Sequence, residues 1–159
     1  MSGVAGDAEL IEFVYHEARL IDEKRFVEWL DLFAEDGLYY MPLTRDQPDG
    51  RLHTSLYYED RLLLKVRIER LSHPNAFSQS EPSWCQHVLQ APRIESQSAD
   101  LAVLRTPYVY AESQGDRQDI YLAVAWHHLT RQEGRLRMQM KKIDLLNRSA
   151  ALPSIQLFL

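Results

Sequence analysis

Hydrophobic positions near the start of the chain recur at helical spacing. They follow one another every three or four residues, at Leu10, Val14, Ala18 and Ile21. This spacing predicts an amphipathic helix with one apolar side, and with Glu12, Glu17 and Arg19 elsewhere around it. The pattern is interrupted at Asp22, so we expect the helix to end there.

A second helix and a strand are expected next. The large apolar residues of this helix fall on one side, at Phe26, Trp29, Leu30 and Phe33. Asp22 is placed to cap it, because a short carboxylate accepts hydrogen bonds from the free amides of a first helical turn. Gly37 is the expected stop, since glycine favours the backbone conformation that ends helices. Residues 38–43 are then typical of a strand, which leads into a loop at residues 44–51.

A third helix is predicted from about Tyr58 to Leu71. Its apolar residues cover a wide arc, with Leu62 and Val66 on one side and Leu64, Ile68 and Leu71 on another. A helix with such a wide apolar surface is expected to lie against a sheet. The segment that follows, residues 72–83, is rich in turn-forming residues.

The second half of the chain changes to the two-residue period of β-strands. Strands are predicted at residues 84–91, 101–112, 119–131 and 136–146. Pro107 is expected to mark an edge strand or a bulge, because proline lacks the amide hydrogen that a central strand uses. Residues 119–131 carry apolar side chains on both sides, so we expect this strand to be covered on both faces. Helices set apart from a long antiparallel sheet predict an α+β fold.

The chain closes on an apolar tail, AALPSIQLFL, at residues 150–159. Large apolar side chains gathered in one place are rarely left in contact with water. The tail therefore either folds back onto the core of the same chain or meets another subunit. The sequence leaves both alternatives open.

Length and composition predict a single domain over residues 1–159. Hydrophobic residues make up 45% of the 159 residues, as a packed domain requires. The net charge of −5 argues against nucleic-acid binding, which depends on clustered Lys and Arg. The longest apolar run, Ile120 to Trp126, is far shorter than the roughly 20 residues that span a bilayer, so no membrane contact is expected. The segment MSGVAGDAEL lacks the features of a signal peptide, and we expect a cytoplasmic location.

The single cysteine, Cys85, narrows the possible chemistry. One cysteine forms no disulfide within the chain, which fits a reducing compartment. It also cannot supply a four-thiolate zinc site, or the two cysteine ligands of a Rieske cluster. Iron–sulfur chemistry within this chain alone is therefore excluded.

Four segments of the chain carry a family resemblance when they are taken in order. They are FVYHEARLIDEKRFVEWLDLFAEDGLYYMPL, LYYEDRLLLKVRIERL, SQSEPSWCQHVLQAPRIE and KKIDLLNRSAALPSIQLFL. Together they resemble the small (beta) subunit of bacterial aromatic-ring-hydroxylating dioxygenases over nearly the whole chain. One departure lies in GDRQDIYLAVAWHHL, because the family usually has more arginine around this aspartate.

The resemblance implies a nuclear-transport-factor-two-like cone, in which a curved, mostly antiparallel sheet packs around helices from the N-terminal half. It also implies a non-catalytic role in assembly, in which a trimer of beta subunits supports alpha subunits as an α3β3 hexamer. In that family the alpha subunit carries the Rieske [2Fe–2S] cluster and the mononuclear iron. Electrons come from NADH through a reductase, sometimes by way of a ferredoxin. The resemblance thus implies no cofactor in this chain and a part in aromatic-compound catabolism.

The histidines prompt a search for a metal site, and none is predicted. His127 and His128 are neighbours on an expected strand, so their side chains leave opposite faces and cannot share one metal ion. His53 and His73 lie beside expected loops without the spacing of a metal motif.

Asp22 and His87 form an alternative candidate site. The cone fold also includes small enzymes such as scytalone dehydratase and ketosteroid isomerase, and CQHV resembles the dehydratase strand that carries a histidine. An Asp–His pair that faces an enclosed cavity is suited to the general acid–base chemistry of a dehydratase or isomerase. The tyrosines that would polarise a substrate oxygen are Tyr39, Tyr40, Tyr108 and Tyr110. The plainer alternative is that Asp22 caps a helix and His87 donates to a buried carbonyl.

Cys85 stands two residues before His87, so both side chains should leave an expected strand on the same side. A thiolate–imidazole pair is one interpretation of this spacing. A buried structural cysteine is the plainer one.

Interface residues are expected among the tryptophans, the arginines of the third helix and the tail. The candidates are Trp84, Arg61, Arg67, Arg70, Phe158 and Leu159. Tryptophan and arginine are enriched where interfaces gain most of their binding energy, and the arginines could pair with acidic residues of a partner. A further hypothesis is a homotrimeric module that sequesters a hydrophobic ligand and has no large partner subunit.

Overall fold

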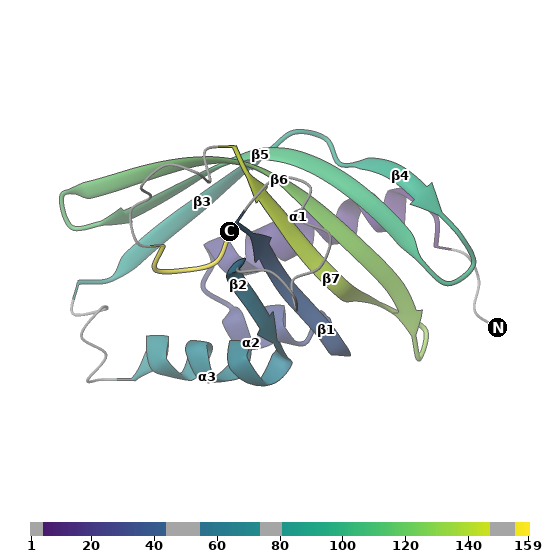
Figure 1. The fold of residues 1–159 in the computed structure, drawn as a ribbon, viewed down its shortest axis with the longest axis horizontal. Helices are drawn as coiled ribbons and strands as arrows, with labels where there is room; N and C mark the ends of the chain where they lie inside the picture. Colours follow the sequence, from purple (N-terminus) through teal and green to yellow (C-terminus); the bar gives the residue numbers. More distant parts are fainter. Residues whose placement is uncertain (1–4, 44–54, 74–80, 147–154) are drawn as a thin grey trace.

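The chain forms a long, curved sheet with helices on its inner side (Figure 1). A computed structural model describes residues 5–43, 55–73, 81–146 and 155–159; the predicted loop at residues 44–51 and His53 lie outside them. The elements are α1 (Asp7–Asp22), α2 (Phe26–Leu30), β1 (Phe33–Pro42), β2 (Ser55–Asp60), α3 (Arg61–Ser72), β3 (Ser83–Leu89), β4 (Arg93–Gln97), β5 (Ala102–Gln114), β6 (Arg117–Gln132) and β7 (Arg135–Leu145). No helix in the described part of the chain is both long and apolar enough to cross a membrane.

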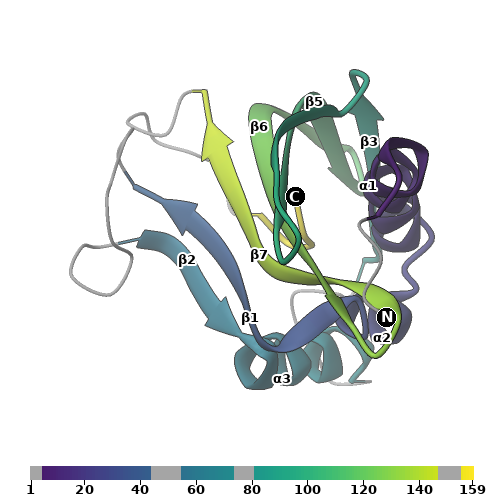
Figure 2. The same cartoon turned by 90° about the vertical axis from the view of Figure 1, so that its right-hand side faces the viewer.

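The strands are ordered β2–β1–β7–β6–β5–β3, and β4 also pairs with β5. All the described pairings are antiparallel except that of β1 with β7, which is parallel. Figure 2 shows the curl of the sheet, with α1 beside β3 and with α2 and α3 below β1. The structure therefore confirms the predicted α+β fold, with a curved, mostly antiparallel sheet around three helices from the N-terminal half.

Alternate residues of β6 separate a buried inner face from a partly exposed outer face. The buried positions are Tyr121, Ala123, Ala125, His127 and Leu129. On the other face Ile120 is 65% exposed and Leu122 is 47% exposed. The prediction that this strand is covered on both faces is therefore wrong for the chain by itself. A second, apolar face of the sheet is in contact with solvent.

The structure corrects the predicted ends of the first two helices. Asp22 is the last residue of α1 and does not cap α2, which begins at Phe26 without a side-chain cap. Gly37 does not end a helix, because β1 already begins at Phe33. A Cβ atom at Gly37 would lie 2.7 Å from the carbonyl oxygen of Met138 on β7. The close approach of these two parallel strands, and not a helix end, therefore requires glycine here.

The third helix begins later than predicted, because residues 55–60 form strand β2. The Asp60 side chain caps α3 by accepting a hydrogen bond from the amide of Leu63 at 2.9 Å. α3 packs against β1, β2 and α2, so its predicted contact with the sheet is confirmed. Only part of its apolar arc is covered: Leu64 and Ile68 are buried, and Leu62, Leu63 and Val66 are exposed.

Pro107 lies at an interruption in the pairing of β5 and not on an edge strand. One side of β5 pairs with β6 along its whole length, and the other side pairs first with β4 and then with β3. Pro107 falls where the partner changes, and its carbonyl oxygen accepts a bond from the amide of Gln90 at 3.0 Å. Its missing amide hydrogen therefore costs no bond within the strand ladder. β4 itself is a strand that the sequence pattern did not predict.

The described end of the tail folds back into the core. Residues 157–159 are buried, and the ring centroid of Phe158 lies 4.4 Å from that of Trp29. Backbone amides of the tail donate to the Glu112 carboxylate, the nearest at 2.7 Å. Of the two alternatives for the tail, the described residues follow the first.

Candidate functional site

An Asp–His pair joins the end of α1 to the edge strand β3. His87 Nδ1 lies 2.6 Å from Asp22 Oδ1, and the backbone amide of His87 donates to both carboxylate oxygens at 3.1 Å. The side-chain amide of Gln86 adds a bond to Asp22 Oδ2 at 3.0 Å. One side of β3 pairs with β5, and its other side has no neighbouring strand among the described residues. Asp22 accepts a hydrogen bond from a backbone amide that this edge strand would otherwise expose. His87 therefore contacts the carboxylate, and not the buried carbonyl of the plainer alternative.

Cys85 belongs to the same cluster. Its Sγ atom lies 3.6 Å from Asp22 Oδ1, and the possible ligand atoms of Asp22, Cys85 and His87 all lie within 4.8 Å of one another. Burial raises the pKa of the Cys85 thiol to about 12, and the nearby Asp22 carboxylate adds to the shift. The thiol therefore keeps its proton at neutral pH, which favours a structural cysteine over a thiolate–imidazole pair. The cluster ties α1 to β3 through hydrogen bonds.

The imidazole of His87 faces inward. Its ring stacks on Tyr108 with centroids 5.6 Å apart, and meets the ring of Tyr110 edge-on at 4.9 Å. His87 Nε2 is buried, and no described residue bonds to it. Tyr40, by contrast, makes an edge-on ring contact with Tyr58 across β1 and β2. The structure thus brings Tyr108 to the Asp–His pair and places Tyr40 against a different strand.

The space found beside the pair is an open groove of about 550 Å³ between α1 and β3. Its lining includes Tyr15, Arg19, Asp22, His87 and Val88. Because Nε2 of His87 is buried, a molecule in this groove would meet the carboxylate side of the pair and not the free nitrogen. General acid–base catalysis needs that nitrogen within reach of substrate. The groove therefore does not supply the enclosed cavity that the acid–base alternative requires.

A second polar cluster lies in the core between α1 and the sheet. Glu17 Oε1 lies 2.7 Å from His127 Nε2 and 2.8 Å from Lys141 Nζ, and Trp29 Nε1 donates to Glu17 Oε2 at 2.8 Å. Burial alone would raise the pKa of Glu17, but Lys141 and His127 outweigh it and hold that pKa below its usual range. Burial lowers the pKa of His127. The cluster therefore holds a carboxylate, an ammonium group and a neutral imidazole that donates from Nε2.

Sequence reasoning missed Glu17 and Lys141. Glu17 falls three residues after Val14 and four before Ile21, so it shares the apolar side of α1 and was wrongly placed elsewhere around the helix. Lys141 lies two residues before the buried Ile143 on β7. Charged residues at core positions of two facing elements are the available signal for a buried ion pair.

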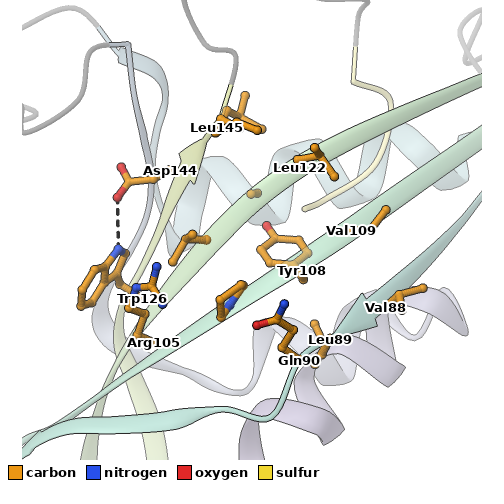
Figure 3. A pocket seen from close by; sticks show the side chains of 14 residues that line it. Val88, Leu89, Gln90, Arg105, Tyr108, Val109, Leu122, Trp126, Asp144 and Leu145 are labelled. Atoms are coloured by element: carbon orange, nitrogen blue, oxygen red, sulfur yellow. Dashed lines mark hydrogen bonds between the residues drawn. The ribbon is translucent and has the colours of Figure 1, made fainter.

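The outer face of β3, β5, β6 and β7 is apolar and partly exposed (Figure 3). Its exposed apolar residues, which we call the outer apolar face, are Val88, Val109, Ile120, Leu122 and Leu146. A groove of about 710 Å³ runs over the same strands and is bordered by Trp126, whose indole nitrogen donates to Asp144 Oδ2 at 3.1 Å. Exposed apolar residues gathered on one surface are typical of protein contact sites.

Three of the predicted interface residues lie at the surface. Trp84 is 60% exposed, and the ammonium group of Lys24 lies 3.8 Å from its ring centroid. Arg70 is exposed on α3, and Arg61 lies half-buried with its guanidinium 3.6 Å from the Asp31 carboxylate. These three side chains are thus placed where a partner could reach them.

The other three are used within the chain itself. Arg67 forms an ion pair with Glu59, donates to the carbonyl of Leu157 at 3.1 Å and lies 4.1 Å from the ring centroid of Phe158. Phe158 and Leu159 are fully buried. The structure therefore corrects the expectation that the end of the tail is available to a partner.

The comparisons with known proteins agree with one another. The family described as Ring hydroxylating beta subunit matches residues 16–151. The chain is 29% identical over 140 residues to the small oxygenase component of the p-cumate 2,3-dioxygenase system of Pseudomonas putida, covering 87% of this chain and 78% of that protein. The beta subunit of the benzoate 1,2-dioxygenase of Burkholderia mallei has a similar fold, with a TM-score of 0.77, 21% identity, and coverage of 97% and 98%. An NTF2-like protein with a cystatin-like fold from Novosphingobium aromaticivorans gives a TM-score of 0.63, 15% identity, and coverage of 88% and 81%.

Proposed function

Because the chain belongs to the ring hydroxylating beta subunit family, we propose that it is the structural subunit of an aromatic-ring-hydroxylating dioxygenase. In this role it supports a larger alpha subunit that dihydroxylates an aromatic compound during its catabolism. The observation that carries the proposal is the family match over residues 16–151, which includes the C-terminal end of α1 and all of the sheet. The relative from the p-cumate system is itself a small oxygenase component, and the proposal extends that role to this chain.

In this proposal the redox cofactors are held outside the chain. Its one cysteine cannot provide the two thiolates of a Rieske cluster, so the alpha subunit would carry both the [2Fe–2S] cluster and the mononuclear iron. NADH would supply electrons through a reductase, with or without a ferredoxin. The contribution of this chain is then a folded surface, and the outer apolar face and Trp84 are suited to protein contacts.

The assembly expected from this role is an α3β3 hexamer in the cytoplasm, built on a trimer of this chain. We expect the chain, coexpressed with its alpha subunit, to copurify with it and to give the hexamer mass by native mass spectrometry. The assembled, iron-loaded complex should hydroxylate an aromatic substrate, and the isolated chain should not. Turnover by the isolated chain, or failure to copurify with the alpha subunit, would contradict the proposal.

The acid–base alternative rests on the 2.6 Å contact between Asp22 and His87 alone, because the groove beside the pair supplies no enclosed cavity. In this alternative the chain is a stand-alone acid–base enzyme of the dehydratase or isomerase type, with Tyr108 beside the reacting base. The isolated chain would then catalyse proton exchange on small ketones, followed by NMR in deuterated water. His87→Gln should abolish that exchange, and His16→Gln, on the exposed side of α1, should not. Absence of exchange by the unaltered chain removes this candidate and leaves the structural role intact.

A further inference from the structure

Four buried polar side-chain atoms on the inner face of the sheet have no hydrogen-bond partner among the described residues. They are His87 Nε2, Thr106 Oγ1, the Tyr108 hydroxyl and His127 Nδ1. None of the four residues is more than 7% exposed. A buried polar group without a partner destabilises the folded state, so proteins leave few of them. Four on one face of one sheet therefore point to a shared partner.

The strand register places the four residues next to one another. His87 on β3 faces Tyr110 on β5, and Tyr108 is the next inward residue of β5. Thr106 follows Tyr108 on the same face, and it lies opposite Ala125 on β6, two residues before His127. Successive and diagonal neighbours on a sheet face are about 7 Å apart, so the four residues form a continuous row. We call this row of four residues the inner polar row.

The hydrogen bonds at the two ends of the inner polar row determine whether a molecule bound there must donate or accept hydrogen bonds. In the neutral ring of His87, Nδ1 donates to Asp22 and Nε2 is left as an acceptor. Glu17 accepts from Nε2 of His127, so Nδ1 of that ring is an acceptor as well. The hydroxyl groups of Thr106 and Tyr108 lie between the two histidines in the row, and each can both donate and accept a hydrogen bond. A bridging molecule must therefore donate hydrogens at both ends, which water does and an anion does not.

Small side chains lie opposite the two hydroxyl residues of the inner polar row. Tyr108 lies opposite Ala123, and Thr106 lies opposite Ala125, both on the buried face of β6. Neither alanine offers a polar side-chain atom. Buried water needs two to four polar partners together with space that side chains do not fill, and this face supplies the partners.

We propose that ordered water molecules bind along the inner polar row and link the Asp22–His87 pair to the buried Glu17–His127–Lys141 cluster. The bound water satisfies the four atoms and connects the polar groups at the edge of the sheet to those in its core. This inference does not depend on the proposed function, because it concerns the interior of the chain alone.

Two conservative substitutions in the full-length chain test the proposal by the sign of their effect. Thr106→Val and Tyr108→Phe each remove one hydroxyl and keep the shape. If the hydroxyls bind water, each variant should lower Tm by about 2–4 °C, since roughly 1 kcal/mol of hydrogen bonding is lost. If the hydroxyls are unsatisfied, removing them relieves a cost, so an unchanged or raised Tm overturns the proposal.

Matched controls are Thr130→Val, at the half-buried end of β6, and Tyr15→Phe, at an exposed position of α1. Both should leave Tm within about 1 °C of the starting protein. A high-resolution crystal structure gives a second measurement that does not depend on any variant. Spherical density within hydrogen-bond distance of two or more of the four atoms supports the proposal. Direct bonds among the four side chains, an empty apolar gap, or density for a larger molecule would overturn it.

Discussion

Glu17 and Lys141 form an ion pair that is fully buried between α1 and β7. Such a pair contributes little net stability compared with apolar residues, but breaking it leaves a buried charge without a partner. We expect Glu17→Gln to lower the free energy of unfolding by about 3–5 kcal/mol, because it leaves the Lys141 ammonium unpaired. Urea unfolding measures the change. Glu12→Gln, on the exposed side of the same helix, is the control and should change stability by less than about 0.5 kcal/mol.

The same cluster predicts loss of stability in acid. Burial lowers the pKa of His127, so the unfolded chain takes up a proton at this residue that the folded chain refuses, and stability falls below about pH 6.5. The pKa of Glu17 is also lowered. Its contribution to the free energy of unfolding is therefore present above about pH 4.5 and is lost as the pH falls further. The free energy of unfolding should therefore decline from pH 7 to pH 4. The decline between pH 7 and pH 5 should be smaller in His127→Gln than in His16→Gln; equal declines would contradict the assignment.

Single residues also show how far the sequence could lead to the candidate site. Sequence reasoning paired Asp22 with His87, and the two side chains are in contact. It correctly ended the first helix at Asp22 but wrongly expected Asp22 to cap the second helix, because local pattern cannot show that a side chain binds a strand 65 residues away. The inner polar row was out of reach for the same reason, since its members come from three strands.

The elements differ in how far their local sequence determines where they begin and end. α1 and the long strands β5, β6 and β7 were predicted because their apolar period persists over many residues. β1 starts earlier than predicted because Phe33 also fits the helical spacing of the residues before it. Its first part is held as a strand by β7, whose Met138 amide donates to the Leu32 carbonyl at 2.7 Å. The short strands β2 and β4 lie at the sides of the sheet and carry too weak a period to be recognised.

The tail is the element whose role a substitution can test most directly. Phe158 packs against Trp29, Tyr39 and Phe26, so Phe158→Ala should lower the free energy of unfolding by about 3–5 kcal/mol. Chemical denaturation of the isolated chain measures this loss. Trp84→Ala removes a side chain of similar size from the surface and should cost far less. If Phe158→Ala affected only assembly with other subunits, the tail would be an interface and not part of the core.

At the scale of the whole molecule, the outer apolar face is the surface expected to meet another subunit. We expect Leu122→Asp to leave the chain folded and to weaken assembly, because it places a charge on a face that would be dehydrated in a complex. Native mass spectrometry of the coexpressed subunits should show less of the assembled complex. Gln132→Asp, at an exposed position at the end of β6, is the matched control. Unchanged assembly of the Leu122→Asp variant would place the subunit contacts elsewhere.

The parallel pairing of β1 with β7 has a consequence for the newly made chain. Phe33 and Leu38 leave the ribosome long before their partners Met138 and Met140, because β7 is the last strand of the sheet to be synthesised. Until then one side of β1 has no neighbour, and the apolar residues of α1 and α2 have only part of their cover. Nascent chains that stop before β7 should therefore bind chaperones or be degraded, since contacts between distant segments form last.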